Sequence, residues 1–322
     1  MGEAVLWVGG PPGAGKTTVA RLLARRHGLR WYNADARTWE HRDRALAAGH
    51  PAAHRFERLS RERRWQEPPA ELLAQSLHRE RGAMVRDDVR ALPPTPLTLA
   101  EGTPVTPSAV GTSDRALWLL PTPEVQRARL VARGLDPDGG PLRLYQLLRE
   151  EIAAEVAAYG ARALPVDGTL DVARTAAAVE DLFADALARG PRTATAAERR
   201  ALLRHANRAL VVQYEQFHAR PWAPRPDPAT TVAFACECGS ADCRADVALT
   251  VEDFPVGDFP VEGFPVGDFP VEGFPAPPAT ASPPLLAPGH ALAHGHATAS
   301  VHATASTAGP RGARRPPLGD LS

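Results

Sequence analysis

The chain contains a single lysine, Lys16, within the stretch GGPPGAGKTT near its start. Lysine and arginine together number 37, and every one of them except Lys16 is arginine. A GC-rich genome favours arginine codons, so arginine clusters carry less information here than usual. A lysine kept against that background indicates a position that needs a slim ammonium rather than a bulkier planar guanidinium.

Residues 10–17 match the pattern G-x-x-x-x-G-K-[ST] in full, between an apolar run at 4–8 and a helical pattern over Lys16–His27. Glycines in such a loop let backbone N–H groups surround a phosphate, and the helix N-terminus adds a positive dipole end. Lys16 would bridge the β- and γ-phosphate oxygens, and the Thr17 hydroxyl would ligate Mg²⁺. The alternative is a glycine turn that only joins a strand to a helix. The predicted ATP-binding residues here are Gly10, Pro11, Pro12, Gly13, Ala14, Gly15, Lys16, Thr17 and Thr18.

Strand and helix patterns alternate over residues 1–190. Strands are expected at 4–8, 29–33, 96–102, 116–120 and 163–168, and helices at 16–27, in pieces over 38–92, after Thr122, at 142–160 and at 171–188. This alternation predicts an α/β fold with a parallel five-stranded sheet and helices on both faces. Ligands of such sheets bind at the carboxyl ends of the strands.

Composition narrows the class of protein. The formal net charge is zero, which gives no electrostatic reason to expect nucleic acid or an anionic membrane as partner. No apolar run approaches the roughly 20 residues of a membrane span. The beginning, MGEAVLWVGG, lacks the basic region of a signal peptide. We therefore expect a cytoplasmic protein.

Over about residues 3–190, the chain resembles the nucleoside-monophosphate-kinase-like and small-metabolite P-loop kinases. ALWLLPTPEVQRARLVARG looks like their fourth strand and lid helix. The resemblance implies that Arg129 and Arg133 close over the transferred phosphoryl group. The alternative is that both are surface arginines on an arginine-rich helix.

The same resemblance suggests further site residues. Glu101 ends the strand in LTLAEGTP, where the family places an acidic residue that holds Mg²⁺ through water or orients the acceptor. A carboxylate at the end of a buried strand is costly without a partner. Asp35 in WYNADARTW matches a carboxylate that contacts the acceptor hydroxyl and can act as base, although it could instead cap the next helix. Asp167 and Gly168 in LPVDGTLD would lie beside the adenine.

Residues 37–64 occupy the place of the family's acceptor-binding helices and are rich in arginine and histidine. A basic pocket there would suit a substrate bearing a phosphate or a carboxylate. Genomic arginine bias on solvated helix faces explains the same pattern equally well. The residues are Arg37, His41, Arg42, Arg44, His50, His54, Arg55, Arg58, Arg61, Arg63 and Arg64.

A second chemical pattern, CECGSADC, places Cys236, Cys238 and Cys243 in a tight turn. Three thiolates this close suit Zn²⁺, which requires a fourth nitrogen or sulfur ligand. His290 in LLAPGH is the first choice for that ligand, ahead of histidines 294, 296 and 302. The segment resembles actinobacterial-type sequences with a CECG…C motif. A structural zinc site, a redox-sensing thiol cluster and free cysteines remain alternatives.

Four regions are predicted: a kinase-like domain at 1–190, a helix and cysteine-knuckle module at 191–250 that residues 284–291 would complete, an FPVGD/FPVEG tandem repeat at 254–274, and a low-complexity tail at 275–322. The helix over 193–220 has an apolar stripe that includes Leu210 and Tyr214. The repeat is interpreted as a neutral expansion rather than an elastic or binding element, and the tail as disordered.

The expected activity is ATP- and Mg²⁺-dependent phosphoryl transfer to a small acceptor, with Lys16, Asp35, Glu101, Arg129 and Arg133 as catalytic residues. One alternative is a nucleotide-dependent switch whose C-terminal module reports to a protein or nucleic-acid partner. Another is a zinc-binding adaptor that the first domain regulates. No fingerprint in the sequence identifies the acceptor.

Overall fold

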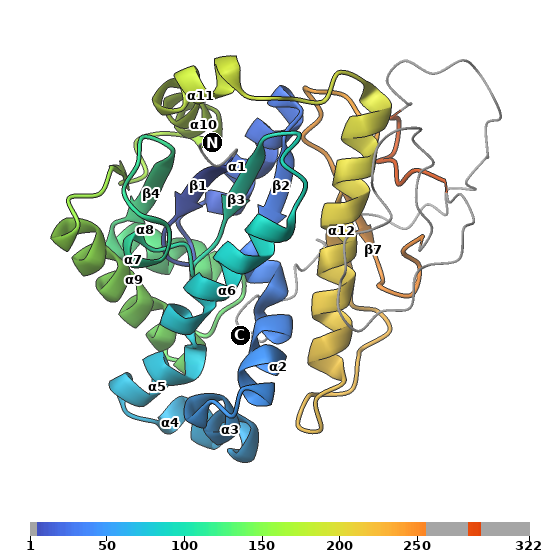
Figure 1. The fold of residues 1–322 in the computed structure, drawn as a ribbon. Helices are drawn as coiled ribbons and strands as arrows, with labels where there is room; N and C mark the ends of the chain where they lie inside the picture. The colour runs from blue at the N-terminus through green and yellow to red at the C-terminus, as the bar shows by residue number, and fades with distance from the viewer. Residues whose placement is uncertain (1–4, 256–282, 291–322) are drawn as a thin grey trace.

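The computed structural model describes residues 5–255 and 283–290. Its centre is a parallel five-stranded sheet of order β2-β3-β1-β4-β5 (Figure 1). The strands are β1 (Val5–Gly9), β2 (Arg30–Asn33), β3 (Thr98–Glu101), β4 (Ala116–Pro121) and β5 (Ala163–Val166). This architecture confirms the predicted α/β fold class. Most of the tandem repeat, and the tail with histidines 294, 296 and 302, lie outside the described residues.

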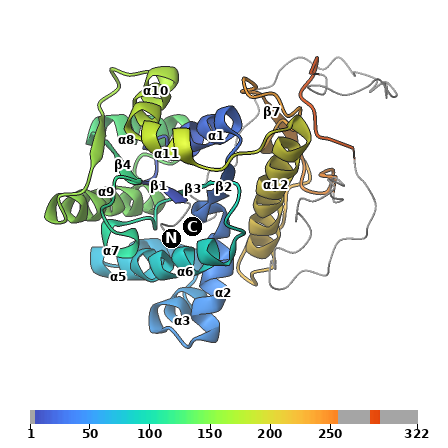
Figure 2. The same cartoon turned by 45° about the horizontal axis from the view of Figure 1, so that its top comes forward.

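Alternation along β1 builds two cores, one on each face of the sheet. Leu6 and Val8 belong to a core with α1 (Lys16–His27), α10 (Val172–Leu182) and α11 (Ala184–Arg189). Val5 and Trp7 belong to the opposite core, with α6 (His78–Ala91) and α9 (Gly140–Ala158). Figure 2 shows these two sets of helices on opposite sides of the strands. Burial on both faces explains why β1 is a continuous apolar run rather than an alternating one.

The connections between strands contain shorter helices. Between β2 and β3 the chain forms a 3₁₀ turn η1 (Ala34–Arg37), α2 (Thr38–Ala47), α3 (Pro51–Arg58), α4 (Arg61–Gln66), α5 (Pro69–Ser76) and α6, which agrees with the expected helical pieces. The sequence patterns missed α7 (Pro107–Val110), which is only one turn long. The helix α8 (Pro123–Ala132) follows β4, and Thr122 caps it as predicted by accepting a hydrogen bond from the Val125 N–H.

The helix α12 (Ala196–His218) runs beside the edge strand β2 and packs against β2, η1 and α2 (Figures 1 and 2). A capping box between Thr195 and Glu198 fixes its beginning. After it, β6 (Val232–Ala235) and β7 (Asp246–Leu249) form an antiparallel pair that flanks the cysteines. The helix of the predicted helix-and-knuckle segment therefore packs against the sheet domain. Within the described ranges, no helix is long and apolar enough to span a membrane.

Candidate functional site

The glycine-rich loop, residues 10–17, joins β1 to α1 at the carboxyl edge of the sheet. Gly13 and Gly15 have φ of 85° and 95°, a region that L side chains rarely adopt. Gly10 has φ of 132°, and a Cβ there would lie 2.3 Å from the carbonyl oxygen of Leu119. No side chain caps α1, and its first turn holds no acidic residue. The loop therefore leaves the N-terminus of α1 open to an anion.

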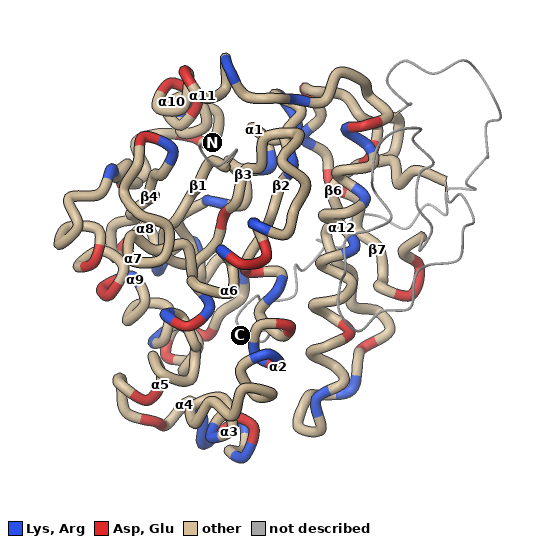
Figure 3. The backbone as a smooth tube through the Cα atoms, viewed as in Figure 1, with Lys and Arg blue, Asp and Glu red and all other residues tan. Residues whose placement is uncertain are grey.

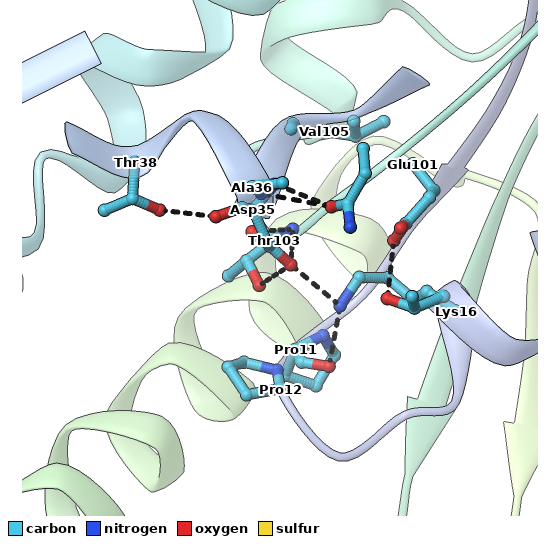
Figure 4. Close-up of polar contacts among 12 residues, drawn as sticks. Pro11, Pro12, Lys16, Asp35, Ala36, Thr38, Glu101, Thr103 and Val105 are labelled. Atoms are coloured by element: carbon cyan, nitrogen blue, oxygen red, sulfur yellow. Dashed lines mark hydrogen bonds and ion pairs between the residues drawn. The ribbon is translucent and has the colours of Figure 1, made fainter. Parts of the chain in front are cut away.

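Lys16 is the first residue of α1, and its side chain is only 4% exposed. Its Nζ donates to the carbonyl oxygen of Pro11 at 3.1 Å and lies 3.7 Å from Oδ2 of Asp35 (Figure 4). The ammonium thus stands between the glycine-rich loop and the end of β2. This position leaves little room for a branched guanidinium.

Asp35 lies in η1, directly after β2, and its carboxylate faces β3. It accepts hydrogen bonds from the backbone N–H of Thr103, at 3.0 and 3.2 Å, and from the Thr103 hydroxyl at 3.1 Å (Figure 4). The cap of η1 is the side chain of Asn33, which accepts from the N–H groups of Asp35 and Ala36. The carboxylate of Asp35 therefore does not act as a helix cap, and it points toward Lys16 instead.

Glu101 ends β3 and is fully buried. Its Oε2 accepts a hydrogen bond from the Thr17 hydroxyl at 3.3 Å, whereas its Oε1 has no partner among the described residues. Burial raises the pKa of Glu101 to about 7; the Lys16 ammonium opposes this rise and Asp35 adds to it. The predicted residues Lys16, Thr17, Asp35 and Glu101 thus meet at one edge of the sheet.

The two predicted lid arginines lie at the end of α8, across the loop. One Nη of Arg129 donates to the carbonyl oxygens of Gly13 and Ala14, at 3.1 and 3.2 Å. Arg133 is the C-cap residue of α8 and lines the cavity described below. Gln126, which the sequence patterns did not single out, donates to the carbonyl oxygens of Pro12 and Tyr145 and so ties the loop to α8 and α9.

A cavity of about 210 Å³ opens beside Lys16. Its wall includes residues from the loop, η1, α6 and α9, and also Gln213 and Tyr214 of α12 and Val232 of β6. The apolar stripe on α12 predicted that Tyr214 would be buried, but not that it would line a cavity. His78 and Arg81 of α6 also line it. A histidine and an arginine in a polar helical stretch give no sequence signal of a site, so sequence reasoning missed them.

Asp167 and Gly168 do not come together with these residues. They follow β5, are exposed, and do not line the cavity. Asp167 accepts hydrogen bonds from the backbone N–H and the hydroxyl of Thr169, which shapes its own turn. A Cβ on Gly168 would contact Val125 of α8 at 3.4 Å.

The cysteine turn forms a compact cluster. Ligand atoms of Cys236, Cys238, Cys243 and His290 all lie within 4.8 Å of one another. Nδ1 of His290 is 3.5 Å from the sulfur of Cys236 and 3.6 Å from that of Cys243. This Cys₃His cluster could bind a metal such as zinc. Of the histidines considered as the fourth ligand, only His290 lies in the described part of the chain.

The cluster is bound to the rest of the protein by buried polar contacts. Arg25 of α1 donates to the carbonyl oxygens of Cys243 and Cys236, at 2.6 and 3.0 Å. Arg204 of α12 and Glu237 form a fully buried ion pair with N–O distances of 2.7 to 3.0 Å. Glu237 also accepts from the side chain of Asn207 and the backbone of Leu285. The cysteine turn is therefore anchored on both α1 and α12.

Comparison with solved structures finds a similarity to the crystal structure of TT1252 from Thermus thermophilus. The two chains are 22% identical, the match covers 55% of this chain and 96% of that one, and the TM-score is 0.33. No protein-family model matches this chain, and no curated protein matches it either.

Proposed function

We propose that this protein transfers the γ-phosphoryl group of ATP to a small-molecule acceptor. The observation that carries the proposal is the position of Lys16, with its ammonium 3.7 Å from Asp35 and the Thr17–Glu101 pair beside it. The glycine-rich loop supplies backbone N–H groups at an uncapped helix N-terminus for the phosphates. Lys16 would neutralise the charge that develops on the transferred group.

Asp35 is suited to handle the acceptor. Asp35 lines the cavity, and its carboxylate accepts three hydrogen bonds from Thr103. It would orient the acceptor hydroxyl and take its proton as the new phosphorus–oxygen bond forms, while the bond to the β-phosphate oxygen breaks and ADP leaves. Arg129 and Arg133 would add positive charge from α8. Most of the rate would come from positioning and electrostatics.

The Thr17 hydroxyl and the Glu101 carboxylate fit Mg²⁺, which prefers oxygen ligands. Oε1 of Glu101 is buried and lacks a well-formed hydrogen bond from the described residues, and a cation would satisfy it. When bound, Mg²⁺ would supply positive charge that neutralises part of the charge on the phosphates. Glu101 would lose its proton when the cation binds and would hold it more readily when the cation is absent.

For the Cys₃His cluster we propose Zn²⁺ with a structural role. Its four donors, three sulfurs and one imidazole nitrogen, are the set that closed structural zinc sites use. Without metal, burial raises the pKa of the Cys236 thiol to about 11, so a cation is needed to hold it as thiolate. Because no open ligand position remains, a catalytic role for this metal is not supported.

A nucleotide-dependent switch is the second candidate function. It is favoured by Arg25, because this residue of α1 contacts the cysteine turn directly and could relay the state of the loop to it. A switch would hydrolyse ATP slowly without an acceptor, and a partner would bind only one nucleotide state.

A screen of hydroxyl-bearing acceptors tests the proposal, with Lys16→Met as the blank. The full-length protein, Mg²⁺ and ATP are incubated with nucleosides, sugars and small hydroxy acids, and new phosphomonoesters are detected by phosphorus NMR. A product that the wild type forms and the Lys16→Met variant does not would support phosphoryl transfer. Slow release of inorganic phosphate with no acceptor product would favour the switch.

A further inference from the structure

Two buried cations, one on α2 and one on α6, line the cavity. Arg42 is 1% exposed and Arg81 is 6% exposed, and both line the cavity. Within residues 5–255 and 283–290, no carboxylate forms an ion pair with either guanidinium. Arg42 donates to the carbonyl oxygen of Gln75, and Arg81 donates to the carbonyl oxygen of Ala34 and to His41. Among the described residues, the hydrogen-bond partners of both guanidiniums are therefore neutral, although Glu57 acts on Arg42, and Asp35 on Arg81, without a direct ion pair.

The Arg42 guanidinium lies over the ring of Phe56, 3.8 Å from its centroid. Several polar atoms in this wall are nevertheless buried without a hydrogen-bond partner in the described part of the chain. They are Nε and Nη1 of Arg42 and both ring nitrogens of His78, which is 3% exposed. Folded proteins rarely leave buried N–H groups unsatisfied unless a ligand or ordered water completes them. His78 starts α6 directly after Leu77, a buried residue with φ of 56°. A left-handed non-glycine residue here fits a site where the backbone is held for function.

The other basic residues of this region behave differently. Arg37 pairs with Glu40, Arg44 with Asp88 and Arg55 with Glu67. Along α2 to α6, basic and acidic positions are interspersed rather than segregated (Figure 3). For most of the arginines in residues 37–64, genomic bias and surface pairing are therefore a sufficient explanation. Arg42 and Arg64 are both buried without an ion pair among the described residues, but only Arg42 lines the cavity, as does Arg81 from outside that range.

Arg81 acts electrostatically on both His78 and Arg42. Burial lowers the pKa of His78 to about 4, and Arg81 adds to this decrease, while the carboxylates of Glu151, Glu155 and Asp35 oppose it. His78 is therefore neutral near pH 7 and can both donate and accept a hydrogen bond. Burial also lowers the pKa of Arg42 to about 9; Glu57 opposes this decrease, and Arg81 adds to it. An anion placed among these groups would remove the cost of burying two like charges.

We propose that the phosphoryl acceptor carries an anionic group, a carboxylate or a phosphate monoester, in addition to its hydroxyl group, and that Arg42, His78 and Arg81 bind this anion. The inference rests on the proposed function, since it assigns the substrate class of the same site. The acceptor would lie with its hydroxyl at Asp35 and its anionic end on the α2–α6 wall. The reaction itself is the transfer described above, and the anionic group takes no part in bond making.

The first experiment measures anion binding apart from catalysis. In the full-length Lys16→Met variant, which weakens the competing phosphate site, binding of inorganic phosphate and of acetate is measured by calorimetry. We then add His78→Phe. Because neither ring nitrogen of His78 has a hydrogen-bond partner among the described residues, this change removes no side-chain hydrogen bond seen there and should preserve the fold and the melting temperature. We expect it to weaken anion binding about tenfold or more, an effect typical of losing one hydrogen bond to a charged group.

Arg42→Gln supplies a second variant, with Arg58→Gln as the matched control because Arg58 is exposed and does not line the cavity. Arg42→Gln should weaken anion binding at least as much as His78→Phe, and Arg58→Gln should leave it unchanged. Stronger binding of phosphate than of acetate would identify a phosphate monoester, and the reverse a carboxylate. Equal anion binding in Lys16→Met, Lys16→Met/His78→Phe and Lys16→Met/Arg42→Gln would overturn the inference.

The second experiment compares glycerate, glycerol 3-phosphate and glycerol as acceptors in wild-type protein. They share a hydroxyl-bearing skeleton and differ in the anionic group. We expect turnover with one of the two anions to exceed that with glycerol by at least tenfold, and His78→Phe to remove this preference. If the turnover of glycerol equals that of both anionic acceptors, the anion site would be rejected and the kinase proposal would stand. Anion binding that depends on His78, with no turnover of these acceptors or of any acceptor in the wider screen, would keep the anion site and reject the kinase.

Discussion

Arg25, in the helix that follows the glycine-rich loop, donates a hydrogen bond of 2.6 Å to the carbonyl oxygen of Cys243. The contact is buried, and burial lowers the pKa of Arg25. A cation is thus held between α1 and the cysteine turn by carbonyl groups. The turn therefore helps to position the helix on which Lys16 and Thr17 stand.

Lys16→Arg is expected to abolish phosphoryl transfer and to leave the fold intact. The ammonium is enclosed by the carbonyl oxygen of Pro11 and the carboxylate of Asp35, and a planar guanidinium is too wide for that position. The loss of kcat should be on the order of 100- to 1000-fold, as for other lost transition-state donors. Circular dichroism and thermal melting check the fold. Wild-type turnover in this variant would contradict the role given to Lys16.

Glu101→Gln should stabilise the metal-free protein at alkaline pH. The pKa of Glu101 in the folded state, about 7, lies above its ordinary value of 4.5, so the folded protein binds more protons than the unfolded chain between these values. Stability therefore falls as pH rises from about 4.5 to about 7. The variant has no carboxylate to ionise at this position. Its free energy of unfolding should therefore exceed that of wild type by about 2–3 kcal/mol at pH 8 and differ little at pH 4.5.

Urea denaturation at the two pH values, with Mg²⁺ removed, measures this effect. The same variant should bind Mg²⁺–ATP more weakly than wild type, because it lacks the carboxylate. A stability difference between variant and wild type that is the same at both pH values would mean that Glu101 titrates normally.

Cys238→Ser should reduce bound zinc from about one ion per chain to nearly none, because a closed zinc site requires all four ligands. The melting temperature should fall by about 5–10 °C, corresponding to a few kcal/mol. Plasma mass spectrometry counts the metal, and Co²⁺ substitution reports tetrahedral thiolate ligation in the visible spectrum. His54→Gln, at an exposed position outside the cluster, serves as the control. If wild-type protein purified without metal is as stable as the zinc-bound protein, the result would favour free thiols.

Glu237→Gln tests the buried ion pair with Arg204. Both side chains are 0% exposed, so the variant removes the buried carboxylate that balances the charge of Arg204 and should lose about 3–5 kcal/mol of unfolding free energy. Asp185→Asn removes the partner of Arg189 in an exposed pair, at 86% and 70% exposure, and should cost less than about 0.5 kcal/mol. Chemical denaturation of the two variants compares them directly, and zinc content is measured alongside. Equal small losses would show that the buried pair is not a stabilising anchor.

Tyr214→Ala should raise the KM for the acceptor about tenfold with little change in the KM for ATP. Tyr214 belongs to α12 yet lines the cavity beside the loop, so its loss would enlarge the pocket and remove an apolar contact. Tyr159→Ala, at a residue 53% exposed, is the matched control. An unchanged acceptor KM would indicate that α12 only covers the strand β2.

The sheet could be predicted because its signals are local. Apolar runs of strand length, glycine at Gly28 as the C-cap of α1 and threonine at Thr122 before α8 depend on neighbours within a few residues. The closing helix was only partly predicted: the single segment expected over 171–188 is two helices that meet at Phe183. Helix breaks of this kind follow from packing, which a propensity pattern does not contain.

The sequence by itself determined the glycine-rich loop, the lone lysine, the cysteine spacing and the alternation that produces a parallel sheet. Tertiary structure decided which distant residues stand beside them: Thr103 against Asp35, His290 against the cysteines, and α12 against the cavity. It also separated Arg42 and Arg81 from the many arginines that only pair on the surface. The physical reason is that burial and the absence of a partner are properties of the packed chain, and residue type alone carries neither.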